Sequence, residues 1–469
     1  MNRVDRDAYL PSWKNVLALL SLILSVFIWV AGLAGSLQRP SVTNSLELRR
    51  LELASIASPL IQNKITKILV GEKPEEILLE TLNDRYSSAT GDLHLYTERE
   101  VLLRTSLLAK QQQSFANEFS KDNFLKFSPK RSLSSFPVRN YWSNTSLETL
   151  NNEKKEQLVL PIYSDPLLLR ISCEVLGKEN CEYLASERKA FFQLLNLILA
   201  PVFALVIGLS LVLRQIWLGW KGKSLSLPVL LAPSFSLIDM VLLIAGGFVA
   251  LGETVSSLLV IPLAQVITNL FNLTSPFKEA VSIVLLYLGL AAMPLLILAL
   301  MFQNKGLASS EGFLQLHWKP WKSTFSQSII YVLSICPLVI LVERLNKLIM
   351  GEPSGSNPLM ILILTSHNTV ALVLFCLPAI FLAPLFEELI FRGVLLPILG
   401  RKFGSGWGIL LSALVFGIAH LSLSELAPLV ALGLGLGLLR VQSGRLAPCV
   451  LMHAFWNSFT IINLVLLGS

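Results

Sequence analysis

The sequence predicts an all-α polytopic membrane protein, a bundle of about 8–10 transmembrane helices with an inserted, mainly helical extracytoplasmic domain. Hydrophobic residues make up 53% of the 469-residue chain and charged residues only 15%, whereas a soluble protein carries about 25% charged residues. The mean hydropathy is +0.63. Long apolar runs follow one another through the second half of the chain, and the charges gather in the segments between them.

The first element expected is a membrane helix within residues 1–37. The apolar run from Val16 to Ala34 is about long enough to cross a bilayer, and Trp13 stands just before it. Small residues follow the run, as they do at signal-peptide cleavage sites. We interpret the segment as an uncleaved anchor, and a cleaved signal peptide is the alternative.

Residues 38–189 are charged, contain no spanning run and are expected to form a soluble domain. Leucines at positions 46, 53 and 60 indicate an amphipathic helix, and residues 75–86 and 97–120 also fit helices. The only histidine of this segment, His94, is expected on the surface. Cys173 and Cys181 are close in sequence, and we expect them to form a disulfide if the domain is extracytoplasmic.

Residues 190–324 are expected to form further transmembrane helices, and residues 325–469 a catalytic transmembrane core. Residues 254–271 are less apolar and fit a surface or re-entrant segment. Pro384 divides the apolar stretch 359–400, which is too long for one straight crossing of the membrane and short for two. The number of crossings after Pro384 therefore stays open. The apolar runs of this half are about 191–213, 229–251, 279–302, 326–342, 359–384, 386–400, 406–421, 426–439 and 446–467.

The positions of the basic residues predict the orientation in the membrane. Lys and Arg gather in cytoplasmic loops, and here they occupy the short loops near residues 221, 319, 401 and 445. Counting the membrane crossings back from these loops predicts that the N-terminus lies in the cytoplasm and residues 38–189 lie outside. The net charge of +7 therefore indicates a cytoplasmic membrane face rather than a nucleic-acid surface. The five cysteines form no CxxC pair, which disfavours a cysteine metal site.

Three ionisable residues interrupt one of the most apolar regions, Leu385-Phe-Glu-Glu-Leu-Ile-Phe-Arg-Gly393. Charged groups are costly in a bilayer and mark functional sites there. On a helix, Glu388 and Arg392 lie four residues apart on one face, so they can form an ion pair. Glu387 points about 100° away and lacks that partner, so it is available to accept or donate a proton. A purely structural ion pair is the alternative.

Two further apolar runs carry polar residues that fit the same site. The first contains His420, and the second contains His453 and Asn457, which share one helix face. A single histidine in an apolar helix is usually a satisfied interior residue. Here successive helices supply a carboxylate, two imidazoles and an amide, which together can provide a base, its partner and oxyanion donors. We therefore expect these side chains to converge.

These motifs, EExxxR at 387–392, FxxxH at 416–420 and HxxxN at 453–457, resemble the CPBP family of type II CAAX prenyl endopeptidases, bacteriocin-processing and abortive-infection membrane proteins. The resemblance covers roughly residues 325–469 and does not reach the 38–189 domain. It implies an intramembrane endopeptidase that cleaves a membrane protein or peptide. It does not imply a prenylated substrate, because bacterial members occur where prenylation is not expected.

By the same resemblance, Glu387 activates the hydrolytic water with help from His420. His453 and Asn457 stabilise the oxyanion, while Glu388 and Arg392 shape the site. A non-proteolytic scaffold or immunity-type protein is the alternative function. An ion-coupled transporter is disfavoured, because the sequence shows no inverted repeat with paired broken helices.

Two designs of the site remain open at this stage. In one, Glu387, His420 and His453 bind divalent zinc, a water fills the fourth position and Glu388 is the base, the usual catalytic zinc arrangement. In the other there is no metal, and Glu387 and His420 activate the water directly. We favour the metal-free design because Asn457 is a poor zinc ligand and Glu388 is engaged by Arg392.

Overall fold

A computed structural model gives the fold. It describes residues 12–39, 42–61, 73–88, 165–176, 184–222, 230–303, 314–351, 357–366 and 368–468, together with Pro228 and scattered single positions between 63 and 111. Every element in these ranges is a helix. Within them, eight helices are long and apolar enough to cross a membrane. The predicted class, an all-α multi-pass integral membrane protein, is therefore confirmed.

The chain divides into two compact units, residues 45–199 and residues 1–44 with 200–469. In the smaller unit, α2 (Val42–Ala57), α4 (Pro74–Ser88) and α8 (Pro166–Leu176) meet around one cation. Arg170 is almost fully buried, donates to the carbonyls of Ser55 and Ile56, and pairs with Glu75 at 3.0 Å. Burial favours the neutral form of Glu174, but Lys110 and Arg170 outweigh it and lower the pKa of this carboxyl.

Several predictions for the smaller unit concern residues outside the described ranges. They are His94, most of the helix expected at 97–120, Cys181 and the side chain of Cys173. The disulfide therefore stays a prediction. The helix expected at 75–86 is confirmed by α4. The helix expected from Leu46 onwards is present as α2, in which Leu53 and Ala57 are buried, but it ends at Ala57, and Leu60 lies beyond it and is exposed.

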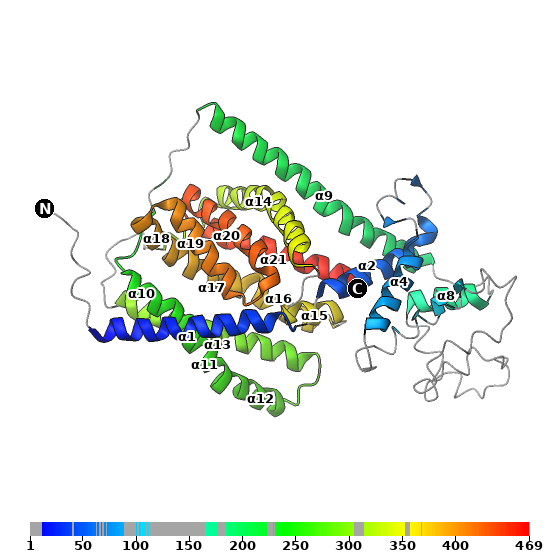
Figure 1. Ribbon diagram of the computed structural model, residues 1–469, viewed down its shortest axis with the longest axis horizontal. Helices are drawn as coiled ribbons and strands as arrows, with labels where there is room; N and C mark the ends of the chain where they lie inside the picture. Colours follow the sequence, from blue (N-terminus) through cyan, green and yellow to red (C-terminus); the bar gives the residue numbers. More distant parts are fainter. Residues whose placement is uncertain are drawn as a thin grey trace. The chain divides into compact units, whose positions relative to one another are not determined.

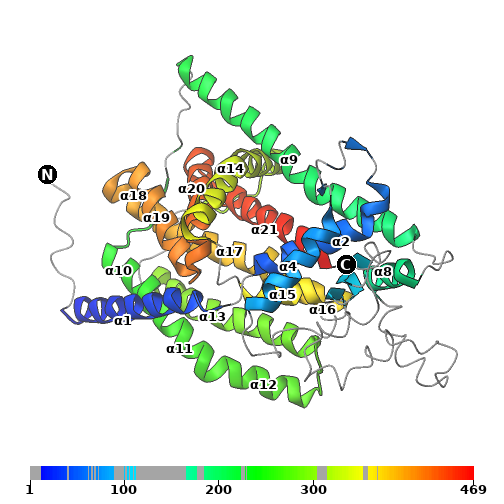
Figure 2. The same cartoon turned by 45° about the vertical axis from the view of Figure 1, so that its right-hand side comes forward.

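The larger unit is the membrane bundle (Figures 1 and 2). Its C-terminal helix pair, α20 (Leu423–Ser443) and α21 (Ala447–Gly468), packs against α14 (Trp321–Met350). The first helix, α1 (Ser12–Ser36), packs against η7 (Leu242–Leu251), where Ser25 donates a 2.7 Å hydrogen bond to the carbonyl of Ala245. This packing favours the interpretation of α1 as a retained membrane helix. The other long helices are α9 (Leu184–Trp220) and α13 (Phe277–Gln303).

The segment at 254–271 continues the helix before it, since residues 237–270 form one helical stretch. This excludes the re-entrant alternative, while a course along the membrane surface stays a prediction. Two stretches of π-helix, whose wider turns alter the direction of the backbone, interrupt the α-helical geometry. The span runs through α10 (Leu237–Val241), η7, α11 (Gly252–Val255), η8 (Ser256–Val260) and α12 (Ile261–Leu270).

The expected division at Pro384 is also wrong. The chain breaks earlier, between the short helix α15 (Pro358–Thr365) and Asn368, and residues 369–403 then form one continuous span. Proline removes a backbone hydrogen bond from a helix, and π-turns after Leu377 and after Glu388 fall close to Pro378 and Pro384 in this span. Its successive parts are α16 (Thr369–Leu377), η9 (Pro378–Leu382), α17 (Ala383–Glu388), η10 (Leu389–Leu395) and α18 (Leu396–Phe403).

The helix after this span, α19 (Ser405–Ala419), is only 15 residues long. It extends about 22 Å and falls short of the roughly 30 Å apolar core of a bilayer. Its close neighbour is α20, whose glycines allow the contact: a Cβ at Gly433 would lie 3.0 Å from Ala413, and one at Gly437 would lie 2.9 Å from Ile409. The glycines at 433 and 437 thus permit close helix packing. Because α19 is short, we expect His420, which directly follows it, to lie within the apolar core of the membrane.

The basic loops of the membrane unit gather at one end of the bundle. Arg401 donates to the carbonyls of Pro233 and Phe235, and Arg445 donates to the carbonyl of Lys319. At the other end, the hydroxyl of Ser36 accepts a hydrogen bond from the backbone of Leu423. The basic loops near residues 319, 401 and 445 therefore share one end of the bundle.

Candidate active site

The acidic pair lies near the middle of the 369–403 span, where α17 passes into the π-turn of η10. Glu387 is 18 residues from the first residue of the span and 16 from the last. π-Turns inside helices are frequently found at functional sites, because the wider turn changes the direction of the side chains. The two carboxylates therefore leave the helix in different directions, and their surroundings differ.

Glu388 and Arg392 form the predicted ion pair, and both side chains are fully buried. The Nη1 atom of Arg392 donates to Oε1 of Glu388 at 2.9 Å, and Nη2 donates to the carbonyl of Gly433 at 3.2 Å. The guanidinium also lies 4.3 Å from the ring centre of Phe416, a cation–π distance. A buried charge requires a partner of this kind, and its removal is strongly destabilising.

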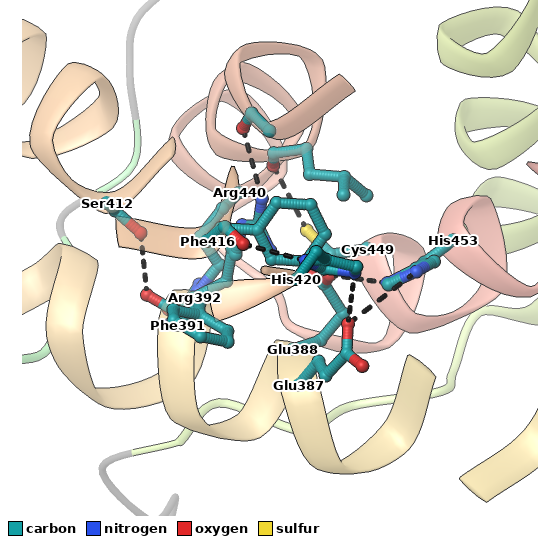
Figure 3. A network of polar contacts seen from close by, with 12 residues as sticks. Glu387, Glu388, Phe391, Arg392, Ser412, Phe416, His420, Arg440, Cys449 and His453 are labelled. Carbon is teal, nitrogen blue, oxygen red and sulfur yellow. Dashed lines mark hydrogen bonds and ion pairs between the residues drawn. The ribbon is translucent and has the colours of Figure 1, made fainter. Parts of the chain in front are cut away.

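Glu388 has a second partner, which the sequence does not predict. Its Oε1 atom also lies 2.9 Å from Nδ1 of His453, whose side chain is only 4% exposed. A carboxylate on one imidazole nitrogen fixes the orientation of the ring. Glu388 thus links Arg392 to His453 and directs the Nε2 atom of the histidine away from the ion pair (Figure 3).

Glu387 faces both histidines. Its Oε2 atom lies 3.9 Å from Nε2 of His420 and 3.9 Å from Nε2 of His453. The expected convergence of Glu387, His420 and His453 is thus present, from the 369–403 span, the end of α19 and α21 (Figure 3). The Glu387 side chain is 14% exposed and that of His420 is 28% exposed, so the cluster is recessed and still reachable.

The hydrogen bonds of His420 decide which of its nitrogens is available. Its Nδ1 atom lies 2.8 Å from the carbonyl of Phe416. A carbonyl can only accept, so Nδ1 carries the proton and Nε2 of the neutral ring presents a lone pair to Glu387. The Oε2 atom of Glu387 is itself buried without a hydrogen-bond partner among the described residues. Two acceptors that face each other across 3.9 Å can be bridged by a water that donates to both.

Asn457 is one helical turn beyond His453, as the motif requires. We expected its amide to face the oxyanion beside His453, but its described contact is with the backbone. Its Nδ2 atom donates a 2.8 Å hydrogen bond to the carbonyl of Ala379 in η9. One of its two amide hydrogens is therefore committed to the backbone of the span that carries Glu387, and the second hydrogen is not used by that bond. This contact joins α21 to the helix before the acidic pair.

Tyr287 is a site residue that our sequence analysis misses. It lies on α13, and its hydroxyl donates a 3.1 Å hydrogen bond to Oε1 of Glu387. The available signal is its position, ten residues into a 27-residue apolar helix. Tyrosines of membrane helices concentrate at the interfaces, so a hydroxyl at this depth calls for a polar partner.

The donor set of Glu387, His420 and His453 suits zinc chemically, but its spacing is wide. Zinc binds such ligands at about 2.0–2.2 Å, which puts tetrahedral ligand atoms about 3.4 Å from one another. The two distances to Glu387 are 3.9 Å, and within the described part of the chain no three metal-binding side chains have the spacing of a metal site. The site would have to contract by about half an ångström to enclose the ion.

Comparison with known proteins agrees with the motifs. The family model described as type II CAAX prenyl endopeptidase, Rce1-like, matches residues 369–459. A model for a domain of unknown function, DUF8675, matches residues 43–192. No curated protein and no solved structure matches the chain. The first match includes all six site residues that the sequence predicts and confirms the resemblance for this segment, but it leaves out α13 and Tyr287.

Proposed function

We propose that the protein is an intramembrane endopeptidase that uses Glu387 to activate water, starting from the match of residues 369–459 to the Rce1-like type II CAAX prenyl endopeptidase family. The observation that carries the proposal is the position of Glu387 Oε2, which has no hydrogen-bond partner among the described residues and lies 3.9 Å from the Nε2 atoms of His420 and His453. The space among these three atoms suits a water molecule. The substrate is a membrane protein or peptide, because the cluster lies at membrane depth.

The contacts support the following reaction. Water donates a hydrogen bond to Nε2 of His420 and transfers its other proton to Glu387. At the same time the water oxygen bonds to the scissile carbonyl carbon. The carbonyl oxygen becomes an oxyanion, which accepts a hydrogen bond from Nε2–H of protonated His453. When the carbon–nitrogen bond breaks, Glu387 passes its proton to the leaving amine. The products are a new carboxyl terminus and a new amino terminus.

Glu388 acts through His453 in this proposal. Its carboxylate accepts from Nδ1 of His453, so it offsets the charge that His453 carries when both ring nitrogens are protonated. Arg392 donates to the same oxygen of Glu388 and holds this carboxylate in place. Asn457 is the second oxyanion donor through the amide hydrogen that Ala379 does not use.

The orientation of the protein follows from the basic loops. Since they meet at one end of the membrane unit, we place this end in the cytoplasm, together with the N-terminus. Residues 38–189 are then extracytoplasmic. The position of Glu387 near the middle of its span supports cleavage of a bond within the bilayer or near it.

The test of the proposed function compares membranes from a wild-type strain and a Glu387→Gln strain by quantitative mass spectrometry of protein termini. We expect at least one membrane protein to accumulate uncleaved in the variant strain, with the matching new termini only in the wild type. This protein identifies the substrate. Identical termini in the two strains would favour the alternative function, a non-proteolytic scaffold that keeps the polar cluster for stability.

The metal-free design makes its own prediction. Zinc at Glu387, His420 and His453 would supply a Lewis acid that lowers the pKa of a bound water, and Glu388 would then be the base. We favour direct activation by Glu387 because Glu388 is fully buried between Arg392 and His453. We expect purified protein to contain zinc well below one equivalent and to keep its activity in a chelator. Near-stoichiometric zinc, with activity lost on chelation and restored by added metal, would establish the zinc design.

A further inference from the structure

We propose that Tyr287 is a positioning residue for Glu387: its hydroxyl holds one carboxylate oxygen, so that the other faces the two histidines. This inference rests on the proposed function, because it assigns a role within that site. It extends the site to α13, a helix that lies outside the segment matched by the endopeptidase family model.

The first support is that the two carboxylate oxygens of Glu387 have different contacts. Oε1 accepts the hydrogen bond from Tyr287 at 3.1 Å. Oε2 has no hydrogen-bond partner among the described residues and lies 3.9 Å from both Nε2 atoms. A glutamate carboxylate rotates readily about its terminal bond. A donor on one oxygen selects the rotamer in which the other oxygen points at the histidines.

The second support is the location of the hydroxyl. Tyr287 is about 15 Å along α13 from its first residue, near the middle of an apolar core. A hydroxyl there is far from bulk water, so a hydrogen-bond partner within the protein stabilises it. Helix α13 packs against α16 and η9, which lead directly into the helix that carries Glu387. The bond is thus made between two helices that already pack together.

The third support is geometric. The Oε1 atom of Glu387 cannot turn toward the histidines without losing the hydrogen bond from Tyr287. The bond therefore sets the direction of the base. Its loss leaves Glu387 in place but less well oriented, so the turnover number falls while substrate binding changes little.

The matched control is Tyr331 on α14. Its hydroxyl also donates to a side-chain oxygen across a helix contact, that of Gln442 on α20. Neither Tyr331 nor Gln442 contacts Glu387, His420 or His453 through any interaction described in the structure. Replacing either tyrosine by phenylalanine removes one hydroxyl and one interhelical hydrogen bond. A merely structural effect would therefore be similar in Tyr287→Phe and Tyr331→Phe.

The test is infrared spectroscopy of the full-length purified protein, recorded as differences between pH values. The Glu387 band is the carboxyl or carboxylate band that disappears in Glu387→Gln. In Tyr287→Phe we expect this band to move, with the carboxyl stretch at higher frequency because Oε1 has lost its hydrogen bond. In Tyr331→Phe it stays at the wild-type position. Tyr287→Leu, which also lacks the hydroxyl, is the second variant if the phenylalanine variant does not fold.

Cleavage of the accumulated membrane protein gives the second readout. We expect about tenfold to hundredfold slower turnover in Tyr287→Phe, with little change in KM, and wild-type turnover in Tyr331→Phe. An unshifted Glu387 band in a folded Tyr287 variant, or equal slowing by both variants, would overturn the positioning role. If Glu387→Gln still cleaves, the proposed function fails instead, and the infrared comparison still decides whether Tyr287 holds Glu387.

Discussion

Replacing Glu387 with alanine is expected to abolish proteolysis, with a loss of about 10²–10⁴-fold or more, the usual contribution of a general base. In the structure no other carboxylate is described as facing Nε2 of both His420 and His453. The measurement is the fraction of uncleaved substrate in membranes of each strain. Arg392→Lys should cause only partial loss, because lysine keeps the charge beside Glu388 but loses the forked geometry.

The control for this prediction is Glu253→Ala. Glu253 is a carboxylate in the membrane unit that is exposed on α11, and we expect this variant to cleave like the wild type. If Glu387→Ala keeps the biological effect of the protein, the base is not Glu387, and the scaffold alternative becomes the better account. Loss of activity in both variants would point to a general effect on the membrane bundle.

Replacing Arg392 with methionine is expected to destabilise the membrane unit by about 3–5 kcal/mol, the usual result of removing one partner from a buried ion pair. Both side chains of the ion pair are fully buried, and His453 is then the only remaining partner described for Glu388. The cation–π contact with Phe416 and the hydrogen bond to Gly433 are lost as well. Thermal unfolding of purified protein in detergent, followed by circular dichroism, measures the change.

Arg401→Met is the matched control for this stability prediction. Arg401 also donates to two backbone carbonyls, those of Pro233 and Phe235, but its removal strands no buried carboxylate in the structure. We expect it to cost about 1 kcal/mol per lost hydrogen bond. Equal destabilisation by Arg392→Met and Arg401→Met would contradict the account of Glu388 as a buried ion that depends on Arg392.

Much of the site could be predicted from the sequence because its contacts are local or belong to short motifs. Glu388 and Arg392 are four residues apart, and helix geometry alone brings them together. The different environments of Glu387 and Glu388 follow from the same geometry. The gathering of Glu387, His420 and His453 was predictable from the cost of isolated polar groups in a membrane.

The contacts that the sequence did not predict join residues far apart in the chain. Nδ1 of His453 contacts Glu388, 65 residues away in the sequence, and Tyr287 donates to Glu387, 100 residues away. Such partners depend on how whole helices pack, which no local spacing reports. The π-turns beside Glu387 were likewise hidden, because Pro384 by itself indicates a break rather than a wider turn within one span.

The central claim is that water activated by Glu387 cleaves a peptide bond of a membrane substrate. It is tested most directly with purified wild-type and Glu387→Gln proteins, each reconstituted in liposomes with the substrate that accumulates in the variant strain, in water labelled with heavy oxygen. We predict that the wild type releases a product with one labelled oxygen at its new carboxyl terminus, while Glu387→Gln releases none. Cleavage by Glu387→Gln at the wild-type rate would contradict the claim.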